Sequence, residues 1–146
     1  MSGLFTSKQS GLRLADYADL RAYRGDQTSV FVSGYLIGKA PAGIAGDFVR
    51  DDDDTTSQDN GGTIIVAANG RRSKRVGHPF IEHFGAVPEP GRDNWQAISS
   101  AIAFAYGAGV PLKAGPGKFE YKTLLDMSYP GLDFGGAGMT QRVCPL

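Results

Sequence analysis

The chain has 146 residues, enough for one ordinary domain or two small ones. Its 15 basic and 15 acidic residues give a net charge of zero, which argues against a nucleic-acid-binding domain because such domains rely on a basic excess. No apolar run reaches the length of a membrane span, so we expect no membrane insertion, and the single cysteine excludes an internal disulfide.

Three segments are expected along the chain. Residues 1–13 form an N-terminal arm, which is either a disordered tail or an arm that becomes ordered on a partner. Residues 14–77 are predicted to form one helix on a small antiparallel sheet, and residues 78–146 a second helix followed by short strands. The 21 glycines and 8 prolines fit this abundance of turns and short strands.

The first helix is predicted over residues 14–23. Asp16 can cap it by accepting hydrogen bonds from the free N–H groups of the first turn. The helix is expected to bury Tyr17, Ala18 and Leu20 on one side.

Four β-rich runs follow this helix. Strands are predicted over residues 29–37, 47–50, 62–68 and 71–76. Asn69 and Gly70 separate the last two runs, and Asn-Gly is the strongest short hairpin signal in a sequence. We therefore expect a two-residue turn with positive φ at both positions.

The second helix is predicted to begin after Asp93, whose carboxylate would serve as the N-cap. Its apolar face comprises Trp95, Ile98, Ile102 and Ala105. The opposite face is small and polar: Gln96, Ser99, Ser100 and Ala103. Glycines end the helix near residue 107, and short strands are predicted over residues 118–125 and 131–134. A helix that caps a stacked coil of strands fits this order, as does an ordinary helix and hairpin of a small α+β domain.

Candidate chemical sites are weak. The acidic run at residues 51–54 lacks the glycine and glutamate of a calcium loop, so we interpret it as a solvated loop. His78 and His83 have no further metal ligands nearby, and Cys144 has no local histidine partner. The basic run at residues 71–75 is interpreted as a solvated strand edge or a contact for an acidic partner.

The carboxylates that follow the second helix are the remaining candidates for chemistry, namely Glu120, Asp126 and Asp133. A glycosidase needs two carboxylates about 5–10 Å apart, and no spacing pairs these. We therefore predict no catalytic, cofactor or metal site in these 146 residues.

Residues 80–140 resemble the opening segment of pectate-lyase-like right-handed β-helices. The resemblance is carried by Phe84-Gly85-Ala86, by Asp93-Asn94 before the helix, by the turn at 115–117 and by the glycine-rich run at 135–139. The family usually has two aspartates in the turn before the helix, and only Asp93 matches here. In that family the helix closes the first coil of the solenoid.

Residues 17–76 resemble the N-terminal module of bacteriophage tailspikes. The motifs recur in the family's order and are Tyr17–Ala22, Val30–Tyr35, Gly46-Asp47-Phe48, Asp59-Asn60-Gly61-Gly62-Thr63 and Lys74-Arg75-Val76. The two resemblances together imply a mainly β chain with two short helices, in which a small α+β anchor module precedes a capping helix and the first coil of a right-handed parallel β-helix.

The resemblance also implies a function. The chain would be the virion-anchoring N-terminal part of a tailspike, made in the host cytoplasm and located in the phage tail. It would form a homotrimer, bind a tail or baseplate protein, and reach host surface polysaccharide through a C-terminal part that is missing here. The positions expected to matter for structure and assembly are Asn69, Gly70, Asp93, Trp95, Ile98 and Ile102.

Two other functions stay open. The chain could be the N-terminal fragment of a polysaccharide lyase or hydrolase whose active site lies beyond residue 146, since sugar-cleaving residues of tailspikes lie on later coils. It could also be a small carbohydrate-binding protein that acts alone. Whether the complete protein is an enzyme is left undecided by these residues.

Overall fold

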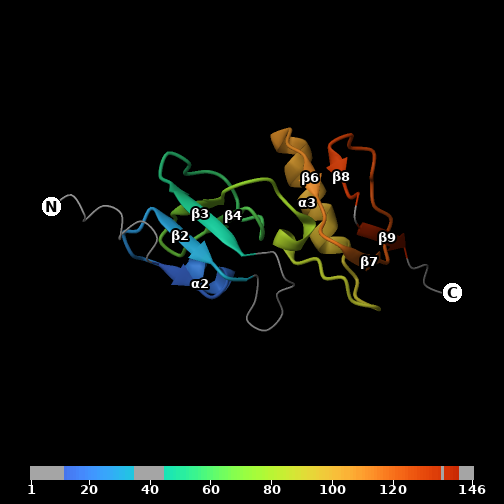
Figure 1. The fold of residues 1–146 in the computed structure, drawn as a ribbon. Coiled ribbons are helices and arrows are strands. Elements are labelled where there is room, and N and C mark those ends of the chain that lie inside the picture. Colours follow the sequence, from blue (N-terminus) through green and yellow to red (C-terminus); the bar gives the residue numbers. More distant parts are fainter. Residues whose placement is uncertain (1–11, 35–44, 136, 142–146) are drawn as a thin grey trace. The chain divides into compact units, whose positions relative to one another are not determined.

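A computed structural model describes residues 12–34, 45–135 and 137–141 (Figure 1). The chain divides into two compact units, Met1–Gly77 and His78–Leu146, each with its own hydrophobic core. Among the described residues no helix is long and apolar enough to cross a membrane. The N-terminal arm falls largely outside this part of the chain, as does Cys144.

The first unit is a five-stranded sheet with one helix. Its elements are β1 (Arg13–Leu14), α2 (Tyr17–Ala22), β2 (Ser29–Val32), β3 (Gly46–Asp51), β4 (Ile64–Val66) and β5 (Arg72–Arg75). The strand order is β1-β2-β3-β5-β4. The pairs among β2, β3, β5 and β4 are antiparallel, as predicted, whereas the short β1 was not predicted and is parallel to β2.

The helix α2 begins later than the sequence pattern indicated. Leu14 lies in β1, and the helix starts at Tyr17. Asp16 is the N-cap, as predicted, and its carboxylate accepts a hydrogen bond of 2.9 Å from the Asp19 N–H. Tyr17 and Leu20 are buried against the sheet, but Ala18 is exposed, so its predicted place in the core is wrong.

The sheet face below α2 supplies the rest of this core. Alternate residues Val30 and Val32 of β2 point inward together with Phe48 of β3 and Ile65 of β4, and all four are buried. The period-two pattern of a half-buried strand therefore places these side chains correctly. The predicted continuation of β2 through residues 35–37 lies outside the described residues.

The hairpin of β4 and β5 is confirmed, but its loop geometry differs from the prediction. The Gly70 N–H donates to the Ala67 carbonyl at 2.8 Å, and the Ala67 N–H donates to the Arg71 carbonyl at 2.9 Å. Gly70 has a φ of 85°, whereas Asn69 does not have a positive φ. This is a three-residue loop in which glycine takes the left-handed position, so the two-residue turn was wrong. The asparagine side chain instead accepts from the Arg71 N–H at 3.2 Å.

The second unit is the start of a parallel β-helix. Its elements are the 3-10 helix η1 (Ile81–Phe84), α3 (Trp95–Ala108), β6 (Leu112–Lys113), β7 (Gly117–Tyr121), β8 (Leu132–Asp133) and β9 (Ala137–Gln141). In Figure 1 β7 and β9 lie side by side, and β6 pairs with β8 in the same parallel sense. Both pairings join residues twenty apart in the sequence, so one coil stacks on the next.

The core of the second unit runs through these coils. Leu112 of β6 and Phe119 of β7 are fully buried. Their pairing partners one coil further on, Leu132 and Met139, are only half-buried. The described residues thus contain one covered coil and one that packs on a single side.

The helix α3 covers one side of this core and contacts η1 and β6. Of its predicted apolar face, Ile98 and Ala105 are fully buried. Trp95 and Ile102 are half-buried, and Ala101 takes a buried place that the pattern did not indicate. On the opposite face Gln96 and Ala103 are exposed, while Ser99 and Ser100 are half-buried.

A buried carboxyl group links η1 to the turn between β6 and β7. Glu82 is 7% exposed, and its Oε2 accepts the Gly115 N–H at 2.8 Å, while Oε1 has no hydrogen-bond partner. A Cβ at Gly115 would come within 2.2 Å of the same oxygen, so glycine allows this approach. Burial is the main reason that the pKa of Glu82 is raised, although two backbone N–H groups oppose it.

The facing of α3 can be tested with two substitutions. Ile98→Ala should cost about 2–5 kcal/mol of unfolding free energy, because a fully buried side chain leaves a cavity. Ser99→Ala should cost within about 0.5 kcal/mol, since its hydroxyl donates only to the Gln96 carbonyl of the same helix. Urea unfolding followed by circular dichroism measures both, and equal losses would contradict this facing.

The raised pKa of Glu82 predicts a pH dependence of stability. A folded-state pKa above the ordinary value of 4.5 means that the folded state holds this proton more tightly than the unfolded state does. The contribution of the protonated carboxyl is therefore complete below about pH 4.5 and is lost as pH rises through the folded-state pKa. The expected result is that Glu82→Gln removes this part of the slope in melting temperature between pH 4 and pH 8.

Glu89 is exposed, so Glu89→Gln is the matched control for that measurement. It should keep the wild-type dependence of melting temperature on pH. A Glu82→Gln profile parallel to the wild-type profile would contradict the assignment to Glu82.

Candidate functional site

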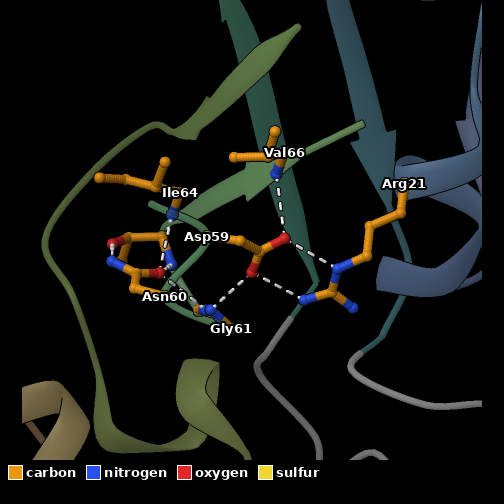
Figure 2. Close-up of polar contacts among 8 residues, drawn as sticks. Arg21, Asp59, Asn60, Gly61, Ile64 and Val66 are labelled. Carbon is orange, nitrogen blue, oxygen red and sulfur yellow. Dashed lines mark hydrogen bonds and ion pairs between the residues drawn. The ribbon is translucent and has the colours of Figure 1, made fainter. Parts of the chain in front are cut away.

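A polar cluster ties the loop before β4 to the helix α2 (Figure 2). The Asp59 carboxylate accepts two hydrogen bonds from the Arg21 guanidinium, at 2.8 and 2.9 Å. It also accepts the backbone N–H groups of Gly61 at 2.9 Å and Val66 at 3.0 Å. These donors lower the pKa of Asp59 against an opposing effect of burial, so the carboxylate stays charged at neutral pH.

Asn60 organises the turn next to it. Its Oδ1 accepts the N–H groups of Gly62, Thr63 and Ile64 at 2.9–3.0 Å. Its Nδ2 donates to the Thr63 hydroxyl at 2.9 Å. One side chain thus fixes a turn of four residues, a role that asparagine can fill because its amide both accepts and donates.

These contacts also close an edge of the sheet. The strand β4 is at the end of the strand order, so one row of its backbone groups has no neighbouring strand. The N–H groups of Ile64 and Val66 in that row are taken by Asn60 and Asp59, and the Ile64 carbonyl accepts the Asn60 N–H at 3.0 Å. An occupied edge offers no template for pairing with another strand.

A second group of contacts joins the turn at Gly62 to Tyr17 of α2 and Arg75 of β5. The Tyr17 hydroxyl donates to the Gly62 carbonyl at 3.0 Å and accepts from Arg75 Nη2 at 2.7 Å. The Arg75 guanidinium lies 4.7 Å from the Phe48 ring centre and 5.8 Å from that of Tyr17. The structure thus brings together motif residues that are up to 58 positions apart in the sequence.

The basic run lies inside the sheet. The strand β5 is flanked by β3 and β4, so the interpretation of residues 71–75 as a strand edge was wrong. Lys74 Nζ lies 2.8 Å from carboxylate oxygens of both Asp51 and Asp54. This pairing raises the pKa of Lys74 and lowers the pKa of both aspartates. The Lys74 ammonium group is therefore bound by two carboxylates of the same unit.

Three residues of the acidic run form ion pairs with the sheet, Asp51 and Asp54 with Lys74 and Asp52 with Arg50 at 3.0 Å. Asp52 and Asp53 are exposed, whereas Asp51 and Asp54 face Lys74. Asp54 also accepts the N–H groups of Thr56 and Ser57, at 3.1 and 2.9 Å. In the part of the chain that the structure describes, no three metal-ligating side chains lie together as a metal site would require.

In the second unit, Asn94 rather than Asp93 occupies the N-cap position of α3. Asp93 Oδ1 does accept the N–H groups of Trp95 and Lys122, each at 3.1 Å. Asn94 is 2% exposed, and its amide exchanges hydrogen bonds with both backbone groups of Val87. It also bonds to the Glu120 carbonyl through its backbone N–H and its Nδ2.

Sequence reasoning placed Asn94 only as the start of the helix and missed this function. Its signal was a short polar residue beside a glycine- and proline-rich turn, which is common in proteins.

The remaining candidate carboxylates and histidines make separate local contacts or are exposed. Glu120 Oε2 accepts the Gly91 N–H at 2.7 Å, Asp126 Oδ1 accepts the Ser128 N–H at 3.0 Å, and Asp133 is exposed on β8. His83 is buried, and its Nδ1 accepts the Phe80 N–H at 3.1 Å, while His78 is exposed. The described geometry therefore favours structural over chemical functions for these side chains.

Substitution of Asn60 tests the importance of the turn. Asn60→Ala leaves the N–H groups of Thr63 and Ile64 without their partner, so we expect a loss of about 1–3 kcal/mol in unfolding free energy. The matched control is Asn69→Ala, which removes one exposed bond in the hairpin loop and should cost under about 1 kcal/mol. Urea unfolding measures both, and a smaller loss for Asn60→Ala would contradict the assignment.

Residues 13–78 match the family model of the phage tail protein small four-stranded beta-sheet domain. This range contains the polar cluster and the four antiparallel strands β2 to β5. Comparison with curated protein sequences finds no match.

Solved structures resemble both units. The tailspike protein of Acinetobacter baumannii phage AM24 is 28% identical with a TM-score of 0.64, over 75% of this chain and 18% of that one. WceF of Pantoea stewartii, a glycan biofilm modifying enzyme with a tailspike-like parallel β-helix, is 18% identical with a TM-score of 0.66, over 89% of this chain and 21% of its own. Tailspike gp49 of A. baumannii bacteriophage Fri1, a capsular polysaccharide depolymerase, is 11% identical with a TM-score of 0.61, over 90% and 23%.

The chain thus spans about a fifth of the length of these structures. The last two resemblances concern the fold alone. Residues 13–78 therefore match a phage tail small β-sheet domain, this segment precedes the start of a parallel β-helix, and the chain as a whole resembles part of a phage tailspike.

Proposed function

We propose that this chain fixes a receptor-binding or polysaccharide-degrading spike to a phage tail. The observation that carries the proposal is the match of residues 13–78 to a phage tail domain directly before a parallel β-helix. The first unit would bind a tail or baseplate protein, and the solenoid that begins after residue 78 would extend toward the host surface.

The contacts of the first unit suit an attachment module. Its hydrogen-bonded turns and the Arg21–Asp59 pair fix the loop before β4 against α2. The edge of β4 is occupied, so docking by strand addition at that edge is disfavoured. Two of its larger apolar side chains, Val49 and Val76, are 43% and 58% exposed and are candidates for the docking face.

We also propose that the chain assembles as a homotrimer with contacts that include residues 92–107. A solenoid coil cannot bury both of its faces alone, and Phe134 and Met139 are half-buried in the last described coil, as is Tyr121 of β7. Neighbouring coils or neighbouring chains would cover such side chains. Sedimentation of the chain at micromolar concentration tests this proposal, and a stable mass of one chain would count against it.

A second candidate function is that of a polysaccharide depolymerase represented here by its N-terminal fragment. The reported activities of gp49 and WceF favour this candidate, although both share only the fold with this chain. Because the active site of this candidate would lie beyond residue 146, the test uses purified phage spikes that contain this chain: a fall in the viscosity of bacterial capsule is expected of a depolymerase and not of an attachment protein alone. Synthesis in the host cytoplasm is a further part of the proposal and is common to both candidates.

Attachment is tested by co-sedimentation of the chain with phage tails from which the spike has been removed. We expect the 146-residue chain to sediment with the tails. The double variant Val49→Lys, Val76→Lys should sediment with them several-fold less. The double variant Thr55→Lys, Gln58→Lys, which adds the same two charges at exposed loop residues of the first unit, is the matched control and should behave as wild type. No co-sedimentation of the wild-type chain at saturating concentration would overturn the proposal.

A further inference from the structure

An aromatic groove of about 510 Å³ lies on the second unit, between α3 and the segment that follows β7. Trp95, Ile102 and Tyr106 line it from the helix, and Leu124, Asp126 and Tyr129 from the opposite side. Its volume is that of a ligand-binding cleft. Tyr106 and Leu124 are 71% and 76% exposed, two of the four large hydrophobic side chains that stand out from the described surface.

Two of the rings, those of Trp95 and Tyr129, donate hydrogen bonds to backbone carbonyls. The Trp95 indole N–H donates to the Leu124 carbonyl at 3.1 Å, and the Tyr129 hydroxyl donates to the Val110 carbonyl at 2.8 Å. The rings of Tyr106 and Tyr129 meet edge to face with centres 5.6 Å apart. These contacts hold the aromatic faces in place while using polar atoms that a ligand would otherwise bind.

Because these polar atoms are already hydrogen-bonded, they favour a ligand with a cation over a polyhydroxylated ligand. A polyhydroxylated ligand needs several free donors and acceptors, but the Ser99 hydroxyl is also engaged, by the Gln96 carbonyl at 3.2 Å. Aromatic faces with one carboxylate are instead what a cation on an apolar stem requires.

The charge of the groove agrees with such a cation. Asp126 is its single charged lining residue, and α3 contains no charged residue at all. The hydrogen bond from Ser128 lowers the pKa of Asp126, so its negative charge persists at neutral and mildly acidic pH. A lysine or arginine entering the groove would meet aromatic faces and a carboxylate with no competing cation in its lining.

We propose that this groove docks a partner polypeptide segment through one lysine or arginine side chain, with Asp126 as its counter-ion and the rings of Trp95, Tyr106 and Tyr129 around its stem. This surface belongs to the second unit and is independent of tail attachment by the first.

Trp95 provides the readout because it is the single tryptophan of the chain. The probe is the peptide acetyl-Leu-Lys-Leu-amide, titrated while tryptophan emission is recorded. The control peptide has norleucine in place of lysine, which keeps the stem and removes the charge. We expect a saturable change with the lysine peptide and binding about threefold weaker or more with the control.

Matched variants assign the effect. Asp126→Asn should weaken lysine-peptide binding about threefold or more, and added salt should weaken it in the wild type. Asp133→Asn, which neutralises an exposed carboxylate of β8 that does not line the groove, should bind as wild type. Circular dichroism melting shows whether each variant is folded, and Tyr106→Leu gives a second, uncharged test with the same expected loss.

Three outcomes would overturn the proposal. The first is equal binding of the lysine and norleucine peptides. The second is unchanged binding by folded Asp126→Asn. The third is no change in tryptophan emission with the lysine peptide, combined with a change on adding a neutral disaccharide. A change that accompanies self-association of the chain, seen by sedimentation at the same concentrations, would count in the same way. None of these outcomes bears on tail co-sedimentation, so the two proposals fail separately.

Discussion

The side-chain oxygens of Asp59 and Asn60 accept hydrogen bonds from backbone N–H groups that no neighbouring strand pairs with. The first unit depends on these hydrogen bonds. An unpaired strand edge must be satisfied by water, by another chain or by side chains. Here two adjacent residues do so from one turn, while Asp59 also binds the helix α2 through Arg21. A single loop thereby joins the helix, fixes the turn and ends the sheet.

The second unit meets the same constraint in another way. Its coils satisfy one another by parallel pairing every twenty residues. Before the first coil, η1 and α3 cover the core, and Asn94 joins the helix start to the preceding turn and to the last residues of β7. Side-chain amides serve both units because they accept and donate at once without carrying a charge into a buried place.

These two solutions fit one mechanical function. A sheet whose edge is occupied and a solenoid whose first coil is covered both limit unintended association, which agrees with the proposed attachment function. The charged residues of the first unit serve this rigidity more than they serve chemistry: Lys74 is shared by two aspartates, and Arg75 lies on aromatic rings. The aromatic groove differs, because its rings are fixed and yet remain accessible.

The sequence by itself determined where the two α-helices lie, though not the 3-10 helix η1, where the β4–β5 hairpin lies, and that Asp16 begins α2. These features depend on neighbours within a few positions, where apolar spacing, capping and turn chemistry act directly. Only the tertiary structure decided that β5 lies inside the sheet, that Asn94 rather than Asp93 joins three segments, and that Trp95 borders a groove. Each of these depends on chain segments tens of residues apart, whose meeting no local pattern specifies.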